Sequence, residues 1–104
     1  MNVADLRRNY TKDSLRRDDL DSNPYGQFRF WIDQALKAEV LEPNAMSLAT
    51  VDAEGRPWTR TVLMKGFSEQ GFLFFTNYES RKAMQLEENP NVSLLFPWLA
   101  LERQ

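Results

Sequence analysis

The sequence contains no cysteine and no histidine among its 104 residues. Without cysteine, the chain can form neither a disulfide nor a thiolate metal site. Without histidine, it lacks the commonest general base and the commonest metal ligand, so Ser-His and Cys-His nucleophile pairs are excluded. If the chain takes part in catalysis, a bound cofactor is the expected carrier of the chemistry. The sequence therefore indicates no catalytic residue and no metal ligand.

Strong charge of one sign and long apolar runs are also missing. The net charge of −2 argues against a general nucleic-acid binder, which is usually basic. The N-terminus lacks the apolar run of a signal peptide, and no stretch is long enough to predict a membrane span. We expect one small cytoplasmic domain without a nucleic-acid or membrane partner.

The residue pattern predicts a polar arm, two helices and four strands. The arm, residues 1–24, is either a solvated leader or carries a short helix near Val3–Arg8. The other expected elements are helices over 25–40 and 81–88, strands over 45–51, 57–64, 72–76 and 92–98, and turns at 53–55 and 68–71. Glu42-Pro43-Asn44 and Asn89-Pro90-Asn91 are expected to end the helices. Aromatic residues at helical spacing in the first helix indicate core packing rather than a ligand site.

Two of the expected strands are apolar on both faces. Residues 72–75 and 92–98 do not alternate regularly between apolar and polar side chains. Such a pattern is expected for a strand that is buried on both faces, as in a closed barrel. Four strands are few for closing a barrel, and unpaired apolar edges favour association. We therefore expect partner strands to lie outside these 104 residues or to come from another subunit.

The start of the second expected helix carries the first chemical signal. In Tyr78-Glu79-Ser80-Arg81-Lys82-Ala83, Ser80 is a good N-cap and places Arg81 and Lys82 in the first turn. Cations are unfavourable there, because the helix dipole prefers negative charge. A bound phosphate would reverse that effect and would also meet the free backbone N–H groups. Alternatively, both side chains point to solvent.

The second signal is the run from Arg60 to Lys65. Arg60, Val62 and Met64 share one face of a strand, and Thr61, Leu63 and Lys65 share the other. A half-buried cation needs a partner, which is either a bound anion or a local carboxylate such as Glu54 or Glu69. Because no glycine-rich phosphate loop occurs, a phosphate site would be made from side chains and a helix end.

The chain closely resembles the pyridoxine/pyridoxamine 5′-phosphate oxidases. The resemblance rests on the segments LRRNYTKDSLRRDDL (6–20), AMSLATVDAEGRPWTRTVLMKGF (45–67), GFLFFTNYESRKAMQLEENPNVSLLFPW (71–98) and LERQ (101–104). It implies an α+β fold, namely a mostly antiparallel split β-barrel of the FMN-binding type, incomplete in this chain. It also implies a homodimer with FMN at the subunit interface. The implied reaction oxidises pyridoxine or pyridoxamine 5′-phosphate to pyridoxal 5′-phosphate, with O₂ as acceptor.

The resemblance also assigns roles to individual residues. Residues 1–24 become a substrate-covering arm, and 25–104 become the N-terminal part of the FMN-binding domain. The implied FMN contacts are Arg60, Thr61, Val62, Leu63, Phe75, Thr76, Arg81, Lys82 and Gln104. The implied substrate contacts are Arg7, Arg8, Asn9, Tyr10 and Lys65. A non-catalytic split-barrel module that binds a flavin or another phosphorylated ligand is the alternative hypothesis.

Members of the resembled family are about twice as long as this chain, which suggests that the 104 residues alone complete only part of the site. We therefore predict weak or no oxidase activity for the isolated chain. The measurement is a flavin-fluorescence titration followed by a turnover assay with O₂. Turnover at ordinary oxidase rates would contradict the prediction.

Overall fold

Two antiparallel sheets and two helices make up the fold, which a computed structural model describes over residues 2–11, 14–76 and 80–104. The elements in chain order are 3₁₀ turns Val3–Asp5 and Arg17–Asp19, helix α1 (Pro24–Lys37), strands β1 (Ala45–Val51), β2 (Pro57–Leu63), β3 (Gly66–Ser68) and β4 (Gly71–Leu73), helix α2 (Arg81–Glu88), strand β5 (Ser93–Leu95) and a 3₁₀ turn Leu99–Leu101. The predicted bounds of β1 and α2 are confirmed, and β2 ends one residue early.

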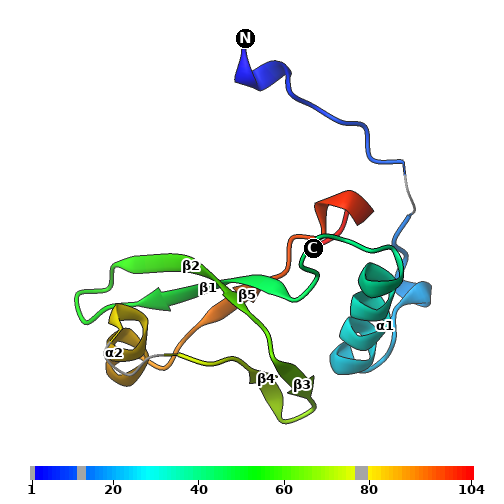
Figure 1. The fold of residues 1–104 in the computed structure, drawn as a ribbon. Coiled ribbons are helices and arrows are strands. Elements are labelled where there is room, and N and C mark those ends of the chain that lie inside the picture. Colours follow the sequence, from blue (N-terminus) through cyan, green and yellow to red (C-terminus); the bar gives the residue numbers. More distant parts are fainter. Residues whose placement is uncertain (1, 12–13, 77–79) are drawn as a thin grey trace.

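The larger sheet has the strand order β2-β1-β5, and β3 and β4 form a separate hairpin (Figure 1). All three pairings are antiparallel, with Ala45 opposite Leu63 and Leu48 opposite Leu94. The described residues therefore form an α+β fold with mostly antiparallel strands and no closed barrel. This is the incomplete arrangement that the sequence predicted.

Strand β1 is the centre of the larger sheet, and only one of its faces is fully buried. Its side chains alternate between buried and half-buried positions along the whole strand. Met46 at one end of the buried face joins the cluster under α1, whereas Thr50 at the other end contacts Gln85 of α2. Both helices thus contact the same face of β1.

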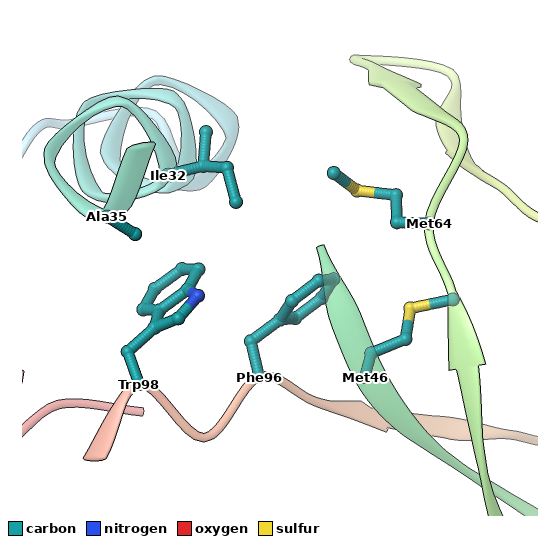
Figure 2. Close-up of a cluster of buried hydrophobic side chains, with 6 residues drawn as sticks. All are labelled: Ile32, Ala35, Met46, Met64, Phe96 and Trp98. Carbon is teal, nitrogen blue, oxygen red and sulfur yellow. The ribbon is translucent and has the colours of Figure 1, made fainter. Parts of the chain in front are cut away.

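The main core fills the space between α1 and the sheet. Its buried members are Ile32, Ala35, Met46, Met64, Phe96 and Trp98, and Figure 2 shows these side chains pointing toward one another from α1, β1, the end of β2 and the segment after β5. Phe28 of α1 contacts the rings of Phe67, Phe72 and Phe96 edge-on, at centroid distances of 4.7, 5.1 and 4.9 Å. Edge-to-face contacts of this kind are favourable beyond the area that they bury. The prediction that aromatic residues of α1 serve the core is confirmed.

The strands that were predicted to be buried on both faces are shorter and more open. Strand β4 stops at Leu73, where residues up to Thr76 were expected, and the side chains of Leu73 and Phe75 are 53% and 71% exposed. Strand β5 covers only Ser93–Leu95 of the expected 92–98. The prediction was wrong because apolar composition does not show which neighbours are present to cover a strand. A further short strand, β3, pairs with β4 and was not predicted.

The predicted end of α1 and the predicted helix of the N-terminal arm were also wrong. Helix α1 ends at Lys37 rather than near Val40. Two residues after this end, Glu39 has a left-handed backbone conformation with a φ of 55°. A left-handed residue after the last turn is a common helix end, although glycine is the usual occupant. The short helix expected near Val3–Arg8 is limited to one 3₁₀ turn, and a second such turn, Arg17–Asp19, was not predicted.

The overall shape is open. The Cα radius of gyration is 16.2 Å, whereas a compact domain of 100 residues has about 13 Å. Figure 1 shows the reason: the N-terminal arm runs away from the sheet, and α1 and α2 lie at opposite ends of it. Among the described residues, no helix has the length and apolar character needed to span a membrane.

The turn between β1 and β2 is built around the carboxylate of Asp52. Its two oxygens accept hydrogen bonds from the backbone N–H groups of Glu54 and Arg56, from Nε of Arg56 and from Nε1 of Trp58, at 2.9–3.0 Å. These donors, the Trp58 N–H foremost, lower the pKa of Asp52 from 3.8 to about 2. The turn also uses Gly55 at a φ of 81°, a left-handed conformation that glycine adopts without strain.

We predict that Asp52→Asn lowers the melting temperature at neutral pH. Because the folded-state pKa is depressed, the contribution of Asp52 is fully present above about pH 4 and is lost as pH falls toward 2. Thermal melts from pH 7 to pH 2 should therefore converge for the two proteins at the acid end. Glu54→Gln is the matched control, because Glu54 is an exposed carboxylate of the same turn. Equal effects of both substitutions would contradict the role of Asp52.

Candidate phosphate-binding site at the start of helix α2

The first turn of α2 begins as the sequence predicted. Ser80 is the N-cap, and its Oγ accepts a hydrogen bond of 3.2 Å from the backbone N–H of Ala83. The first turn contains no acidic residue, and Arg81 and Lys82 occupy its opening positions. Tyr78 and Glu79, which precede the cap in the sequence motif, lie outside the described residues. The helix start therefore places two cations in the turn whose first backbone N–H groups have no acceptor within the helix itself.

Arg81 and Lys82 point to different neighbours. The Nζ of Lys82 donates to Oγ1 of Thr76 at 2.5 Å, and Oγ1 of Thr76 lies 3.4 Å from Oγ of Ser80. The guanidinium carbon of Arg81 lies 4.5 Å from the ring centroid of Trp58, a cation–π contact. Lys82, Thr76 and Ser80 thus form one polar group at the helix start, and Arg81 lies beside it over β2.

Arg60 reaches α2 from the inward face of β2. Its Nη1 donates to the Leu48 carbonyl at 3.1 Å and to Thr50 Oγ1 at 2.8 Å, and its Nη2 donates to Gln85 Oε1 at 2.9 Å. Desolvation lowers the pKa of Arg60 from its ordinary value. Neither carboxylate considered as a local partner is used: Glu54 pairs with Arg56, and Glu69 accepts from Asn23.

Within residues 2–11, 14–76 and 80–104, these contacts leave the positive charges of the site without a carboxylate partner. Among the described residues, Arg60 and Lys82 bond to neutral oxygens, Arg81 lies over a ring, and the ion pairs seen are those of Arg56 with Asp52 and Glu54. Charge-assisted hydrogen bonds to a phosphate are stronger than bonds to neutral acceptors. The donor set therefore fits a phosphate monoester, such as the one that FMN carries.

The other predicted cofactor contacts are spread more widely. Val62 shares the inward face of β2 with Arg60 and packs against the core, whereas Thr61 and Leu63 lie on the exposed face. Phe75 is exposed beside Thr76. Gln104 lines an apolar cavity of about 420 Å³ between α1 and β5, away from the start of α2. The structure thus brings Arg60, Thr76, Arg81 and Lys82 together, and it does not bring Gln104 to them.

The predicted substrate contacts do not form one group in this chain. Arg7, Arg8, Asn9 and Tyr10 are exposed on the extended arm, and Tyr10 lines a cavity with Leu99 and residues 102–104. Lys65 follows β2, where its backbone N–H donates to the Leu73 carbonyl at 2.7 Å while its side chain is exposed. Among the described residues, the Lys65 side chain has no hydrogen bond or ion pair, so its ammonium group is available to a ligand.

Two residues of the site, Thr50 and Gln85, were not predicted from the sequence. Both are almost fully buried, at 1% and 3% exposed, and they are hydrogen-bonded to each other as well as to Arg60. A signal was present: Thr50 follows Met46 and Leu48 on the buried alternation of β1, and Gln85 lies one turn after Arg81. A polar residue at a core position needs a partner, and Arg60 was the available donor.

Comparisons with solved structures define the class of the fold. PhzG from Burkholderia lata 383, solved in complex with tetrahydrophenazine-1-carboxylic acid, is 34% identical with a TM-score of 0.75 over 81% of this chain and 43% of its own. A pyridoxamine 5′-phosphate oxidase-related, FMN-binding protein from Nostoc punctiforme PCC 73102 is 33% identical with a TM-score of 0.57, over 67% of this chain and 40% of its own. The open sheet and the helix start described above are thus part of the split-barrel fold of FMN-binding proteins.

Sequence comparisons give the family. The profile of the pyridoxamine 5′-phosphate oxidase family matches residues 32–104. A pyridoxine/pyridoxamine 5′-phosphate oxidase of Crocosphaera subtropica is 62% identical over all 104 residues, which cover 49% of that relative. The relative from Paraburkholderia phymatum is 59% identical over 102 residues, or 48% of its length. The chain belongs to the pyridoxamine 5′-phosphate oxidase family, and it spans about half the length of these curated relatives. The family and its FMN-binding neighbour support FMN as the cofactor.

Proposed function

We propose that this chain forms the FMN-phosphate-binding part of an enzyme that oxidises pyridoxine or pyridoxamine 5′-phosphate to pyridoxal 5′-phosphate, with O₂ as acceptor. The observation that carries the proposal is the group of cations at the start of α2, in a chain that is 62% identical to a relative of that name. A flavin-binding module without catalysis would have the same helix start. It would not need the arm residues Arg7 and Arg8 or Lys65, because it would bind no phosphorylated substrate. We therefore favour the enzyme.

The chain's own residues would contribute binding and orientation. The backbone N–H groups after Ser80, together with Lys82, Arg81 and Arg60, would hold the cofactor phosphate and so fix the position of the attached ring system. When bound, FMN supplies the redox chemistry that a chain without histidine and cysteine cannot perform. Lys65 and the arm residues Arg7 and Tyr10 would bind the phosphate of the substrate, a second anion on a chain whose net charge is −2.

We also propose that the enzyme is a cytoplasmic homodimer. The larger sheet ends in β2 on one side and in β5 on the other, and within the described residues neither outer edge is paired. Apolar side chains on these strands and next to them are exposed, among them Leu63 of β2, Leu95 of β5 and Val92 just before β5. Open edges and exposed apolar groups favour association with further strands. A second copy of the chain, as the family resemblance implies, would cover part of this surface.

The proposed phosphate site predicts that Lys82→Ala weakens FMN binding about tenfold or more, because a charge-assisted hydrogen bond is lost. Binding of riboflavin, which has no phosphate, should change little. Both affinities can be measured by flavin-fluorescence titration of the 104-residue chain.

Lys37→Ala is the matched control, since Lys37 is an exposed lysine at the end of α1. Failure of the unsubstituted chain to bind FMN would count against the proposed function. An equal loss of riboflavin binding would contradict a phosphate contact.

The proposed substrate site predicts a different pattern for the double substitution Arg7→Ala with Lys65→Ala. In a protein of the relatives' length that contains these 104 residues, KM for the phosphorylated substrate should rise at least tenfold, because two phosphate-binding charges are removed. The affinity for FMN should stay within about twofold. Steady-state kinetics and flavin titration measure the two quantities.

Arg16→Ala with Lys37→Ala removes the same number of charges from exposed positions and serves as control. If the Arg7 and Lys65 double variant lost FMN affinity and substrate affinity equally, the division into two phosphate sites would be wrong.

A further inference from the structure

A polar network with two buried members joins three elements beside the proposed phosphate site. Thr50 of β1 and Gln85 of α2 are 1% and 3% exposed, and both accept hydrogen bonds from Arg60 of β2. Thr50 and Gln85 are also hydrogen-bonded to each other through Oγ1 and Oε1. Buried polar groups are costly unless they are paired, so this network has a defined hydrogen-bond pattern.

The direction of each hydrogen bond follows from the groups present. Because an arginine donates and never accepts, Thr50 Oγ1 receives a hydrogen from Arg60, and its own hydroxyl hydrogen goes to Gln85 Oε1. Gln85 Oε1 thus accepts from both Thr50 and Arg60. Replacing this single oxygen by an apolar group would remove the acceptor of the buried Thr50 hydroxyl and of one Nη2 hydrogen of the half-buried Arg60.

The same pattern leaves one edge of the guanidinium unused. The acceptors on Thr50 and Gln85 are bonded to each other, so they lie together at the edge that Nη1 and Nη2 share. The remaining Nη1 hydrogen goes to the Leu48 carbonyl. Among the described residues, the structure gives no acceptor for Nε–H. This hydrogen and the second Nη2 hydrogen point in parallel from the Nε–Nη2 edge of the guanidinium. Such a pair of parallel donors matches two oxygens of a phosphate.

Gln85 connects this arginine to the start of α2. It lies three residues after Lys82 and four after Arg81, so one helical turn separates it from both. Arg81 contacts Trp58, which is two residues before Arg60 on the same face of β2. Arg60 of β2 and Arg81 of α2 are therefore held relative to each other through the contacts of Gln85 and Trp58.

The partners of Arg60 in the part of the chain that the structure describes are all neutral. A carboxylate at position 85 would hold the guanidinium equally well but would oppose a phosphate dianion nearby. An amide holds the group while leaving its positive charge uncompensated. This combination of full burial, a double acceptor and no charge suits a residue that orients a cation toward an anionic ligand.

We propose that Gln85 is a positioning residue of the phosphate site: with Thr50, it fixes the Arg60 guanidinium so that the Nε–Nη2 edge is available to the cofactor phosphate. The inference rests on the proposed function and adds to it a residue that does not itself touch the ligand. It requires that Gln85 act through Arg60, so substitutions at the two positions should not be additive.

The first test compares FMN with riboflavin in the 104-residue chain. Gln85→Leu should reduce the preference for FMN over riboflavin about tenfold, and Arg60→Ala should add little to that loss. Gln85→Glu keeps the acceptor and the fold but supplies a negative charge, so it should also lower the preference. Gln27→Leu, a half-buried glutamine of α1 on the other side of the molecule, is the matched control. An unchanged preference in both Gln85 variants would overturn the proposal.

The second test does not need a flavin. In nitrogen-15 NMR spectra of the unsubstituted chain, the Nη groups of Arg60 should give separate, slowly exchanging signals, because three hydrogen bonds stop their rotation. Gln85→Leu should average these signals, whereas Gln85→Glu should retain them. Thr50→Val, which leaves Gln85 in place, should broaden them to an intermediate degree.

The two tests separate the possible failures. Absence of FMN binding by the unsubstituted chain would count against the proposed function, and the Arg60 signals would still decide whether Gln85 holds the guanidinium. Unchanged Arg60 signals in Gln85→Leu would overturn the positioning role even if FMN binds. Should Gln85→Leu fail to fold, as a thermal melt would show, Gln85→Glu supplies the binding result and Thr50→Val supplies the NMR result.

Discussion

The buried face of β1 is the constraint on which the rest of the structure depends. Strand side chains alternate between faces, so a shift of one residue in register would move every buried side chain of β1 to the opposite side. β1 pairs with both β2 and β5, and its buried face meets α1 at Met46 and α2 at Thr50. The pairing register that buries Met46 therefore also sets Thr50 opposite Gln85. Packing at one end of the strand and polar chemistry at the other are linked by the same alternation.

In the part of the chain that the structure describes, the cations of the candidate site at the start of α2 contact neutral groups, so their charges are not compensated. Carboxylates are abundant in the sequence, with 15 acidic residues against 13 basic ones. The carboxylate of Asp52 instead stabilises the turn between β1 and β2, where it accepts hydrogen bonds from backbone N–H groups and from the side chains of Arg56 and Trp58. Arg60, held by a carbonyl, a hydroxyl and an amide, is partly desolvated without being neutralised. An anion that binds there meets charges whose positions are already fixed, which reduces the entropy that binding costs.

The proposed phosphate site and the proposed substrate site differ in how many of their residues this chain brings together. The proposed phosphate donors of this chain lie within one turn at the start of α2 and on the facing strand β2. The arm residues and Lys65 lie apart and exposed, and the chain spans about half the length of its curated relatives. The solved PhzG, crystallised with a phenazine compound, shares the fold at 34% identity, so the fold alone does not fix the substrate.

The sequence by itself determined the elements whose signals are local. The alternation of β1, the turn before Arg56, and Ser80 with the two cations after it depend on residues within a few positions of one another, and they appear where the pattern placed them. Only the tertiary structure decided which neutral groups accept hydrogen bonds from Arg60, because Thr50 and Gln85 are 35 residues apart in the chain. It also decided that Leu73 and Phe75 are exposed, since burial depends on which other strands are present and not on the apolarity of the strand itself.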